Sequence, residues 1–299
     1  MPDFGIMRGF NEKLFGDKLV AGQLPINLGL IGSQDVESLL LDFYPNAAAA
    51  YSLRKLRLLY TGSAIRVRRS SDNTEQDIGF VSNDLDTTAL TSFCSGTNGF
   101  VTTWYDQSGN GNNATQTTAA NQPQIVSSGS IININSKASL QFDGVNQRFN
   151  IPTISIAFNS LSIMGVVKSD SATSNGMPFA NPDSERIYLG YITSSTLYFG
   201  YNDAATKFNL GAATTNQELI ELYAGTNANA YRNTNASTQI TSATTNITTT
   251  DLSIGSYNRS GTKSNYYDGN IQEIIMYTSN QSSNRTGIET NINTYYAIY

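Results

Sequence analysis

The sequence predicts a mainly β protein built as a two-sheet antiparallel sandwich. Only 14% of the 299 residues are charged, against about 25% in an average globular domain, and Ser, Thr, Asn, Gln and Gly fill the difference. Short hydroxyl and amide side chains hydrogen-bond their own backbone, which favours turns and strands over helix interiors. Many short apolar segments without helices between them indicate antiparallel sheets, and a chain of this length packs them most simply as a sandwich.

The expected strands are separated by clusters of Asn, Gly, Ser and Asp, which are typical turn residues. Their ranges are Phe100–Tyr105, Ser139–Phe142, Leu161–Val167, Arg186–Leu189, Thr196–Tyr201, Leu219–Ala224, Leu252–Gly255 and Ile271–Tyr277. A further strand is expected at Ala64–Arg68, where Ile65 and Val67 face inward and the arginines face solvent.

Two segments predict peripheral helices. In the first, Asn46 is a capping residue, Ala47–Ala50 favour helix, and Leu53, Leu56 and Tyr60 share one face before Gly62. The second closes the chain, where Ile288, Ile292, Tyr295 and Tyr296 recur at helical spacing after Ser282 or Ser283.

Residues 1–45 differ from the remainder, because glycines interrupt their apolar pieces too often for an independent core. We expect an extended N-terminal arm that docks on a partner, followed by one domain over residues 46–299. The alternative is an arm that packs back on its own domain. The residues expected to dock are Phe10, Leu14, Phe15, Leu28 and Ile31.

Charge and composition exclude several function classes. A net charge of −5 argues against a nucleic-acid partner, and the arginines around Arg66 and Arg68 are interpreted as a solvated strand face. The chain contains no histidine, which removes histidine-based catalysis and metal ligation. Cys94 is the single cysteine, and no segment resembles a secretion signal or a membrane span. We therefore expect folding in a reducing cytosol, with no membrane insertion and no cofactor.

Two groups of motifs resemble known families. Ala50–Arg54, Ala64–Asp72 and Trp104–Gln116 together resemble the N-terminal half of the catalytic domain of fungal-type α-L-arabinofuranosidases. Leu140–Gly144 and Tyr267–Ile275 are similar to laminin-G-like and concanavalin-like lectin domains. The resemblance covers residues 47–299 and implies a concanavalin-like jelly roll.

The resemblance also points to catalytic positions. Glu185 stands where the arabinofuranosidase family carries its nucleophile, but Tyr257 stands where the acid/base aspartate is expected. Tyrosine, with a pKa of about 10 in solution, is a poor proton donor to a sugar leaving group at neutral pH. Met177 and Pro178 occupy the region of the family's paired cysteines. These departures predict that the chain is not an enzyme.

Neighbouring carboxylates leave the catalytic alternative open. A retaining glycosidase needs a nucleophile and an acid/base about 5 to 5.5 Å apart, and Asp251 or Asp268 could supply the second group. Asp268 lies in a Tyr-Asp-Gly turn, where an acidic residue most simply supports the backbone.

Asp106, Ser108 and Asn110 match the first half of a calcium loop, although Thr117 replaces the closing glutamate. A tight turn held by Asp106 and Asn110 is the favoured alternative. Several side chains are glycan-binding candidates, although strand aromatics are more often core or pocket wall. They are Trp104, Asp106, Asn110, Glu185, Tyr188, Tyr257 and Asn258.

Lectin-like jelly rolls with a short arm and no disulfides are similar to decoration, head-fibre and tail-fibre proteins of tailed phages. The sequence-based hypothesis is therefore a virion surface protein, assembled in the host cytoplasm. Its arm would anchor to capsid or tail proteins, and a multi-copy lectin-like domain would contact glycans. The alternatives are a glycoside hydrolase of α-L-arabinofuranosidase type using Glu185, and a purely structural cement protein.

Overall fold

The computed structural model describes residues 38–173, 176–180, 187–193, 195–201, 207–237, 240–241, 246–249, 252–259 and 262–299. The chain divides into two compact units, residues 1–37 and 38–299. All described helices and strands lie in the second unit.

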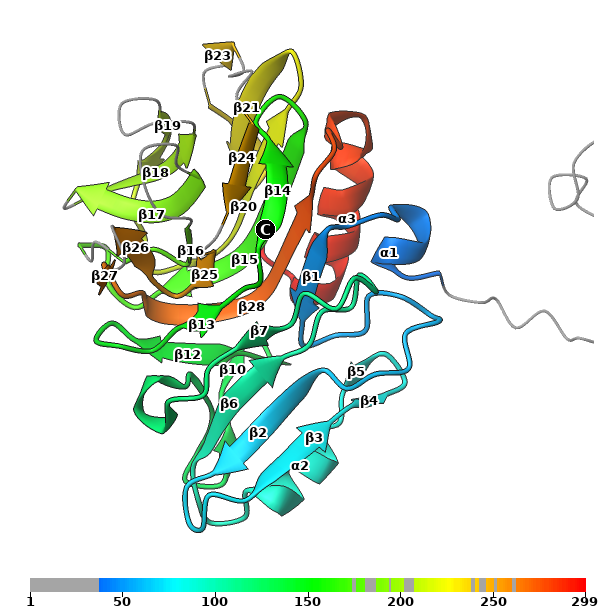
Figure 1. The fold of residues 1–299 in the computed structure, drawn as a ribbon, viewed down its shortest axis with the longest axis vertical. Helices are drawn as coiled ribbons and strands as arrows, with labels where there is room; N and C mark the ends of the chain where they lie inside the picture. The colour runs from blue at the N-terminus through cyan, green and yellow to red at the C-terminus, as the bar shows by residue number, and fades with distance from the viewer. Residues whose placement is uncertain are drawn as a thin grey trace, which may run out of the picture. The chain divides into compact units, whose positions relative to one another are not determined.

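Most strands of the described residues join one large, nearly closed antiparallel sheet (Figure 1). Its centre is β28 (Asp268–Tyr277), which pairs with β15 (Leu161–Ser169), β1 (Ala49–Ser52) and β12 (Leu140–Asp143). On the other side of β15 lies β20 (Gln217–Ala224), which continues to β21 (Asn227–Arg232). Side chains along β15 and β20 are buried almost throughout, as expected for strands covered on both faces. The predicted mainly β, antiparallel fold is confirmed.

The remaining strands of this sheet lie on either side of that centre. The first group is β2 (Ile65–Arg69), β3 (Glu75–Ile78), β6 (Gly99–Trp104), β7 (Ala114–Thr115), β8 (Gln124–Ser127), β9 (Ser130–Ile131) and β13 (Phe149–Asn150). The second group is β16 (Phe179–Ala180), β17 (Ile187–Thr193), β18 (Thr196–Tyr201), β19 (Lys207–Ala212), β22 (Asn235–Ala236), β23 (Ile240–Thr241) and β25 (Ser253–Ile254). Each predicted strand segment forms a strand, with ends that differ by at most four residues.

Four separate two-stranded pairs complete the strands. They are β4 (Phe80–Val81) with β5 (Asp84–Leu85), β10 (Asn133–Ile134) with β11 (Lys137–Ala138), β14 (Ile154–Ala157) with β24 (Asn246–Thr249), and β26 (Tyr257–Arg259) with β27 (Thr262–Ser264).

The first predicted helix is wrong, because Ala49–Ser52 forms strand β1 instead. Ala49 pairs with Met276 and Ser52 pairs with Glu273 along the edge of β28. Asn46 does not cap a helix and has a positive φ of 67°. Helix propensity differs by less than about 1 kcal/mol between most residues, so a buried strand partner outweighs it. Ala49 and Ala50 are both buried.

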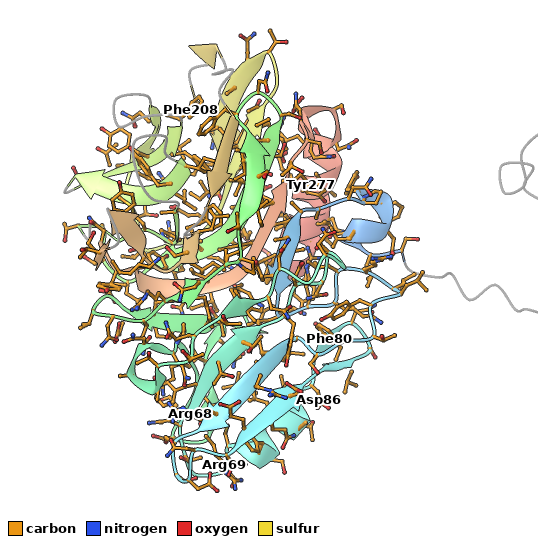
Figure 2. The ribbon with its side chains drawn as sticks, viewed as in Figure 1. Arg68, Arg69, Phe80, Asp86, Phe208 and Tyr277 are labelled. Carbon is orange, nitrogen blue, oxygen red and sulfur yellow. The ribbon has the colours of Figure 1, made fainter. Side chains whose placement is uncertain are left out.

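The C-terminal helix is confirmed as α3 (Arg285–Tyr296), preceded by a 3₁₀ turn at Ser282–Asn284. Ile288, Ile292 and Tyr296 are buried on one face of α3 and pack in a cluster with residues of β15, β20 and β28. Tyr277 of β28, labelled in Figure 2, belongs to this cluster and donates its hydroxyl to the Tyr44 carbonyl at 2.7 Å. This helix therefore covers the outer face of the central strands.

Three short helical segments complete the described elements. Leu40 and Leu41 of α1 (Leu40–Phe43) are buried in the same cluster as α3. α2 (Thr87–Phe93) is capped by the preceding Asp86, whose carboxylate accepts a hydrogen bond from the Ala89 amide at 2.9 Å. A 3₁₀ turn lies at Ala119–Asn121.

The arginines of β2 lie on the face that the sequence predicted. Ile65 and Val67 are fully buried, whereas Arg66 and Arg68 are partly exposed. Arg66 forms a two-point ion pair with Asp77 at 2.8 and 2.9 Å. Arg68, at the lower end of the molecule in Figure 2, donates to the Gln122 side chain at 2.7 Å. Both guanidinium groups are thus occupied by partners within the domain.

Candidate active site

Three strands bring the sequence-predicted site positions together. Phe179 and Ala180 of β16 pair with Leu189 and Tyr188 of β17 on one side. On the other side they pair with Ile254 and Ser253 of β25. As a result, β16, which follows Met177 and Pro178, lies between two strands. One is β17, which contains Tyr188, and the other is β25, which leads to Tyr257.

Side chains from these segments form a separate buried cluster, which we call the tyrosine cluster. Its members are Met177, Ala180, Tyr188 and Tyr257, and none is more than 7% exposed. The resemblance assigned Met177 to the family's sugar pocket and Tyr257 to the acid position. The structure therefore places these predicted positions in direct proximity, although the tyrosine rings lie inside the protein.

Gly200 is required for this arrangement. It lies directly opposite Tyr188 in the β17–β18 pair. A Cβ atom on Gly200 would lie 2.1 Å from two ring atoms of Tyr188. Only glycine allows the Tyr188 ring to cross its neighbouring strand so closely.

Backbone hydrogen bonds fix the segments that surround the tyrosine cluster. The Gly255 amide donates to the Pro178 carbonyl at 2.9 Å, and the Tyr267 amide donates to the Gly255 carbonyl at 2.9 Å. Ser253 is fully buried and donates its hydroxyl to the Ser256 carbonyl at 2.6 Å. The turn between β25 and β26 is therefore held on both sides.

Two candidate carboxylates, Glu185 and Asp251, lie outside the described residues. In the sequence, Glu185 precedes the first residue of β17 by two positions, and Asp251 precedes the first residue of β25 by two positions. Asn258 belongs to β26, where its backbone pairs with Lys263.

Asp268 is the described candidate for a second carboxylate. It begins β28 and pairs with Asp143 of β12. Partial burial, with the nearby charges of Asp170 and Asp143, raises the pKa of its carboxyl group. A carboxyl group whose pKa is raised keeps its proton to higher pH, which is the property required of a general acid.

Trp104 does not lie on a surface that a sugar can reach. Its side chain is fully buried in the main core. Its ring lies 5.9 Å from the ring of Tyr51 and 6.3 Å from that of Phe149. The indole therefore acts as a core residue, which was the alternative interpretation of the strand aromatics.

Asp106 holds a tight turn. Its carboxylate accepts hydrogen bonds from the backbone amides of Ala50, Ser108 and Asn112 at 2.8 to 3.0 Å, and from the Ser108 hydroxyl at 2.7 Å. Asn110 donates to the Ser108 side chain within the same turn. These contacts are the ones that the tight-turn interpretation predicts, and they occupy the Asp106 oxygens that a calcium ion would need. Among the described residues, no three His, Cys, Asp or Glu side chains form a metal site.

The predicted docking residues Phe10, Leu14, Phe15, Leu28 and Ile31 lie outside the described residues, so the docking arm stays a prediction. No helix in the described ranges is long and apolar enough to cross a membrane.

Residues 43–290 match the family described as "Alpha-L-arabinofuranosidase B, catalytic". The chain belongs to this family. The match includes the tyrosine cluster, the position of Glu185 and the strands around them. It ends within α3.

Similar proteins agree with this family. The probable α-L-arabinofuranosidase B of Aspergillus flavus and the α-L-arabinofuranosidase B of Aspergillus oryzae are each 40% identical over 74 residues, which cover 24% of this chain and 15% of each relative. The fold is similar to an arabinofuranosidase in complex with arabinofuranosyl-α-1,2-xylobiose, at 17% identity and a TM-score of 0.62. It is also similar to a GH54 α-L-arabinofuranosidase soaked with a cyclic sulfate inhibitor, at 17% identity and a TM-score of 0.63. Each structural match covers 85% of this chain and 63% of the other, so the chain spans only part of these proteins.

The family match corrects two predictions. The expected virion surface protein of decoration, head-fibre or tail-fibre type is wrong, since the matched family is the catalytic part of a glycosidase. The expectation that the chain is not an enzyme is wrong for the same reason. It rested on Tyr257 at the acid/base position and on Met177 and Pro178 in the region of the paired cysteines, whereas the family match extends over most of the chain.

Sequence reasoning missed the residues that support the site. Gly200 looked like one of many glycines, and its role depends on the register between β17 and β18. Ser253 gave a weak signal, because a polar residue between Leu252 and Ile254 in a short apolar strand needs a buried partner.

Proposed function

We propose that this chain is a glycoside hydrolase domain of the α-L-arabinofuranosidase type. The observation that carries the proposal is the match of residues 43–290 to the family's catalytic part. The clustering of Met177, Tyr188 and Tyr257 supports it. The resemblance placed Met177 in the region of the family's paired cysteines and Tyr257 at its acid/base position, and Tyr188 was a glycan-binding candidate. The substrate class is a sugar with a terminal α-L-arabinofuranosyl unit.

Glu185 is the proposed nucleophile. In a retaining mechanism its carboxylate attacks the anomeric carbon, the bond to the leaving oxygen breaks, and a covalent glycosyl-enzyme forms. Water then attacks the same carbon and releases arabinose. A second group must donate a proton to the leaving oxygen in the first half and accept a proton from the attacking water in the second half.

Asp268 is the proposed acid/base among the described residues. A phenol such as Tyr257 is a poor donor at neutral pH, whereas the raised pKa of Asp268 suits proton donation. Asp251 is the competing candidate from the sequence. The proposal therefore assigns Glu185 to attack and one of these two aspartates to proton transfer.

Turnover of two substrates with different leaving groups tests these roles. A nitrophenyl α-L-arabinofuranoside has a leaving group that departs without protonation, whereas an arabinofuranosyl xylo-oligosaccharide needs an acid. We expect the wild-type chain to cleave both, and Glu185→Gln to lose at least about a hundredfold in rate on both. Asp268→Asn should lose activity on the oligosaccharide and keep bond cleavage on the nitrophenyl glycoside.

Asp251→Asn is the matched control for Asp268→Asn, since both changes remove one carboxylate charge. If Asp251→Asn gives the selective loss instead, the acid role moves to Asp251. Absence of turnover by a folded wild-type chain on both substrates contradicts the proposed function. Turnover that Glu185→Gln leaves unchanged contradicts the assignment of the nucleophile.

Two finer points belong to this proposal. The nearly closed sheet is interpreted as a concanavalin-like jelly roll of two packed sheets, which the order of the lectin-like motifs at Leu140–Gly144 and Tyr267–Ile275 supports. A glycan is the expected partner. The compartment in which the chain folds, its copy number and the docking of residues 1–45 stay predictions from the sequence.

A further inference from the structure

An open groove of about 460 Å³ lies outside the tyrosine cluster and shares none of its residues. One wall comes from Asn46–Ala48, which precede β1. A second wall comes from Asn110 and Asn112 of the turn that Asp106 holds, and a third comes from Thr153–Ser155 at the start of β14, with Thr278 after β28. The volume lies within the range of about 300 to 1,000 Å³ that is typical of small-molecule sites.

The lining of the groove is polar and carries no charged side chain. Its polar members are Asn46, Asn110, Asn112, Thr153, Ser155 and Thr278. All of these are exposed except Asn112, which is half-buried. The other lining residues are two alanines and Ile154, which leave room for a ligand to approach the backbone. An ionic ligand would find no counter-charge here, whereas a ligand rich in hydroxyl groups would find amide and hydroxyl partners.

Two asparagine side chains are held rigidly in this groove. The Asn110 amide nitrogen donates to the Ala47 carbonyl at 2.9 Å and to the Ala48 carbonyl at 3.2 Å. The Asn112 amide nitrogen donates to the Ala48 carbonyl at 2.8 Å. Because a carbonyl oxygen only accepts hydrogen bonds, the nitrogen of each side-chain amide must face it, and each Oδ1 atom is directed away.

The backbone beneath these amides is also fixed. The Asp106 carboxylate accepts hydrogen bonds from the backbone amide of Asn112 at 3.0 Å and from the backbone amide of Ala50 at 2.8 Å. It therefore joins the turn to strand β1. Asp106 is 4% exposed. A ligand that donates hydroxyl hydrogens to the two Oδ1 atoms would therefore order very little of the protein on binding, which favours affinity.

We infer that this groove is a binding site for an uncharged polysaccharide or oligosaccharide, separate from the proposed catalytic residues. Sugar hydroxyl groups donate to the Oδ1 atoms of Asn110 and Asn112, and the hydroxyls of Thr153 and Ser155 complete the hydrogen bonding. The open shape suits a chain that continues beyond the groove on either side. Such a site holds the polymer on the domain whether or not the chain cleaves it.

Affinity electrophoresis in gels that contain soluble arabinoxylan tests this site, with polygalacturonate as an anionic comparison. The double variant Thr153→Arg/Ser155→Arg fills the groove from two exposed positions, one just before β14 and one within it, and leaves the Asp106 turn intact. The double variant Thr286→Arg/Thr290→Arg, at two exposed positions on α3, is the matched control for added charge and size. All proteins carry Glu185→Gln, so that the polymer stays uncut.

We expect arabinoxylan to retard the Glu185→Gln chain and the Thr286→Arg/Thr290→Arg control equally. The groove variant should lose at least about tenfold in apparent affinity while its unfolding midpoint stays unchanged. Equal retardation of the groove variant, no retardation of any protein by arabinoxylan, or retardation by polygalacturonate alone overturns the inference. Because binding is measured without turnover, these outcomes are independent of whether the domain proves to be a hydrolase.

Discussion

Gly200 shows how one residue determines the packing of the candidate site. A methyl group at this position would overlap the Tyr188 ring, since the added Cβ atom would lie 2.1 Å from two of its carbons. We expect Gly200→Ala to displace the ring and to reduce the free energy of unfolding by about 1 to 3 kcal/mol, the usual cost of overpacking. Chemical denaturation measures this loss. Activity on a nitrophenyl arabinofuranoside should fall with it, because Tyr188 belongs to the tyrosine cluster.

Gly165→Ala is the matched control, because Gly165 is also buried within a strand of the sheet. Its added Cβ atom would meet neighbours at no less than 3.8 Å, which is ordinary van der Waals contact. Replacing a strand glycine by alanine then stabilises by up to about 1 kcal/mol through reduced chain entropy. Equal losses for both variants would show that the close approach at Gly200 has no special importance.

Side-chain roles could be predicted where they depend on neighbours in the sequence. The turn at Asp106 was recognisable, because Asp, Ser and Asn at alternate positions before glycine bind their own backbone. The burial of Trp104 could not be recognised in this way. It contacts Tyr51 and Phe149, which lie about 50 residues before and after it in the chain. Residue type alone cannot distinguish a core tryptophan from a sugar platform.

At the scale of elements, strand β20 and helix α3 bring two buried carboxyl groups near each other. Glu221 is fully buried and Glu289 of α3 is 4% exposed. Burial, followed by the hydrogen bond and the charge of Glu289, raises the pKa of Glu221 well above its usual value, while Tyr223 and Arg285 act in the opposite direction. Tyr223 donates its hydroxyl to Glu221 at 2.7 Å. Glu221 therefore keeps its proton to higher pH in the folded state than in the unfolded state.

This pair predicts how stability depends on pH. Between the unfolded pKa and the higher folded pKa of Glu221, the folded state binds more protons than the unfolded state. The free energy of unfolding must then decrease as pH rises, by up to about 1.4 kcal/mol per pH unit for one proton. In Glu221→Gln the amide replaces the protonated carboxyl, so we expect this dependence above about pH 5 to become weaker. Thermal unfolding at several pH values measures it.

Glu75→Gln serves as the control for the pH series, because Glu75 is exposed on β3. It should unfold with the same pH dependence as the wild-type chain. An identical pH profile for Glu221→Gln and the wild-type chain would mean that Glu221 does not retain a proton on folding.

The two predicted helices had opposite outcomes for a physical reason. The pattern at the C-terminus places apolar residues on one side over three turns, and α3 uses that face against the sheet. The segment after Asn46 had high helix propensity but only a short apolar pattern. Its small alanines instead lie in β1 beside β28, with Ala49 in the main core and Ala50 in the α3 cluster, and pairing with β28 satisfies their backbone. Tertiary hydrogen bonds at a buried strand outweigh local propensity.

At the scale of the whole molecule, the fold could be predicted more securely than the function. Strand patterns are repeated many times along the chain, so errors at single positions do not change a mainly β result. Function was inferred from a few departures from the family, Tyr257 at the expected acid position and Met177 and Pro178 in the region of the paired cysteines, and from a similarity to phage proteins that no residue pattern carried. The family match over residues 43–290 outweighs those few positions. A catalytic carboxylate can come from another strand, which is the role proposed for Asp268, and sequence spacing does not show it.

The boundary of the folded domain gives a last prediction. The domain described here begins at Ser38, and residues 38–45 are joined to it by specific contacts. Leu40 and Leu41 are buried against the α3 cluster, and the Leu41 amide donates to the Leu56 carbonyl at 2.7 Å. A chain of residues 38–299 should therefore unfold at the same denaturant concentration as the full chain.

A chain of residues 46–299 lacks both leucines, and truncation of one buried leucine usually costs about 2 to 5 kcal/mol. We expect this shorter chain to lose at least about 3 kcal/mol of unfolding free energy, measured by urea denaturation beside the 38–299 chain. The comparison separates two interpretations of the N-terminus, since both truncations remove the predicted docking residues but only one removes α1. Equal stability of the two truncated chains would mean that α1 does not contribute to the core. Destabilisation of the 38–299 chain would mean instead that residues 1–37 pack on the domain.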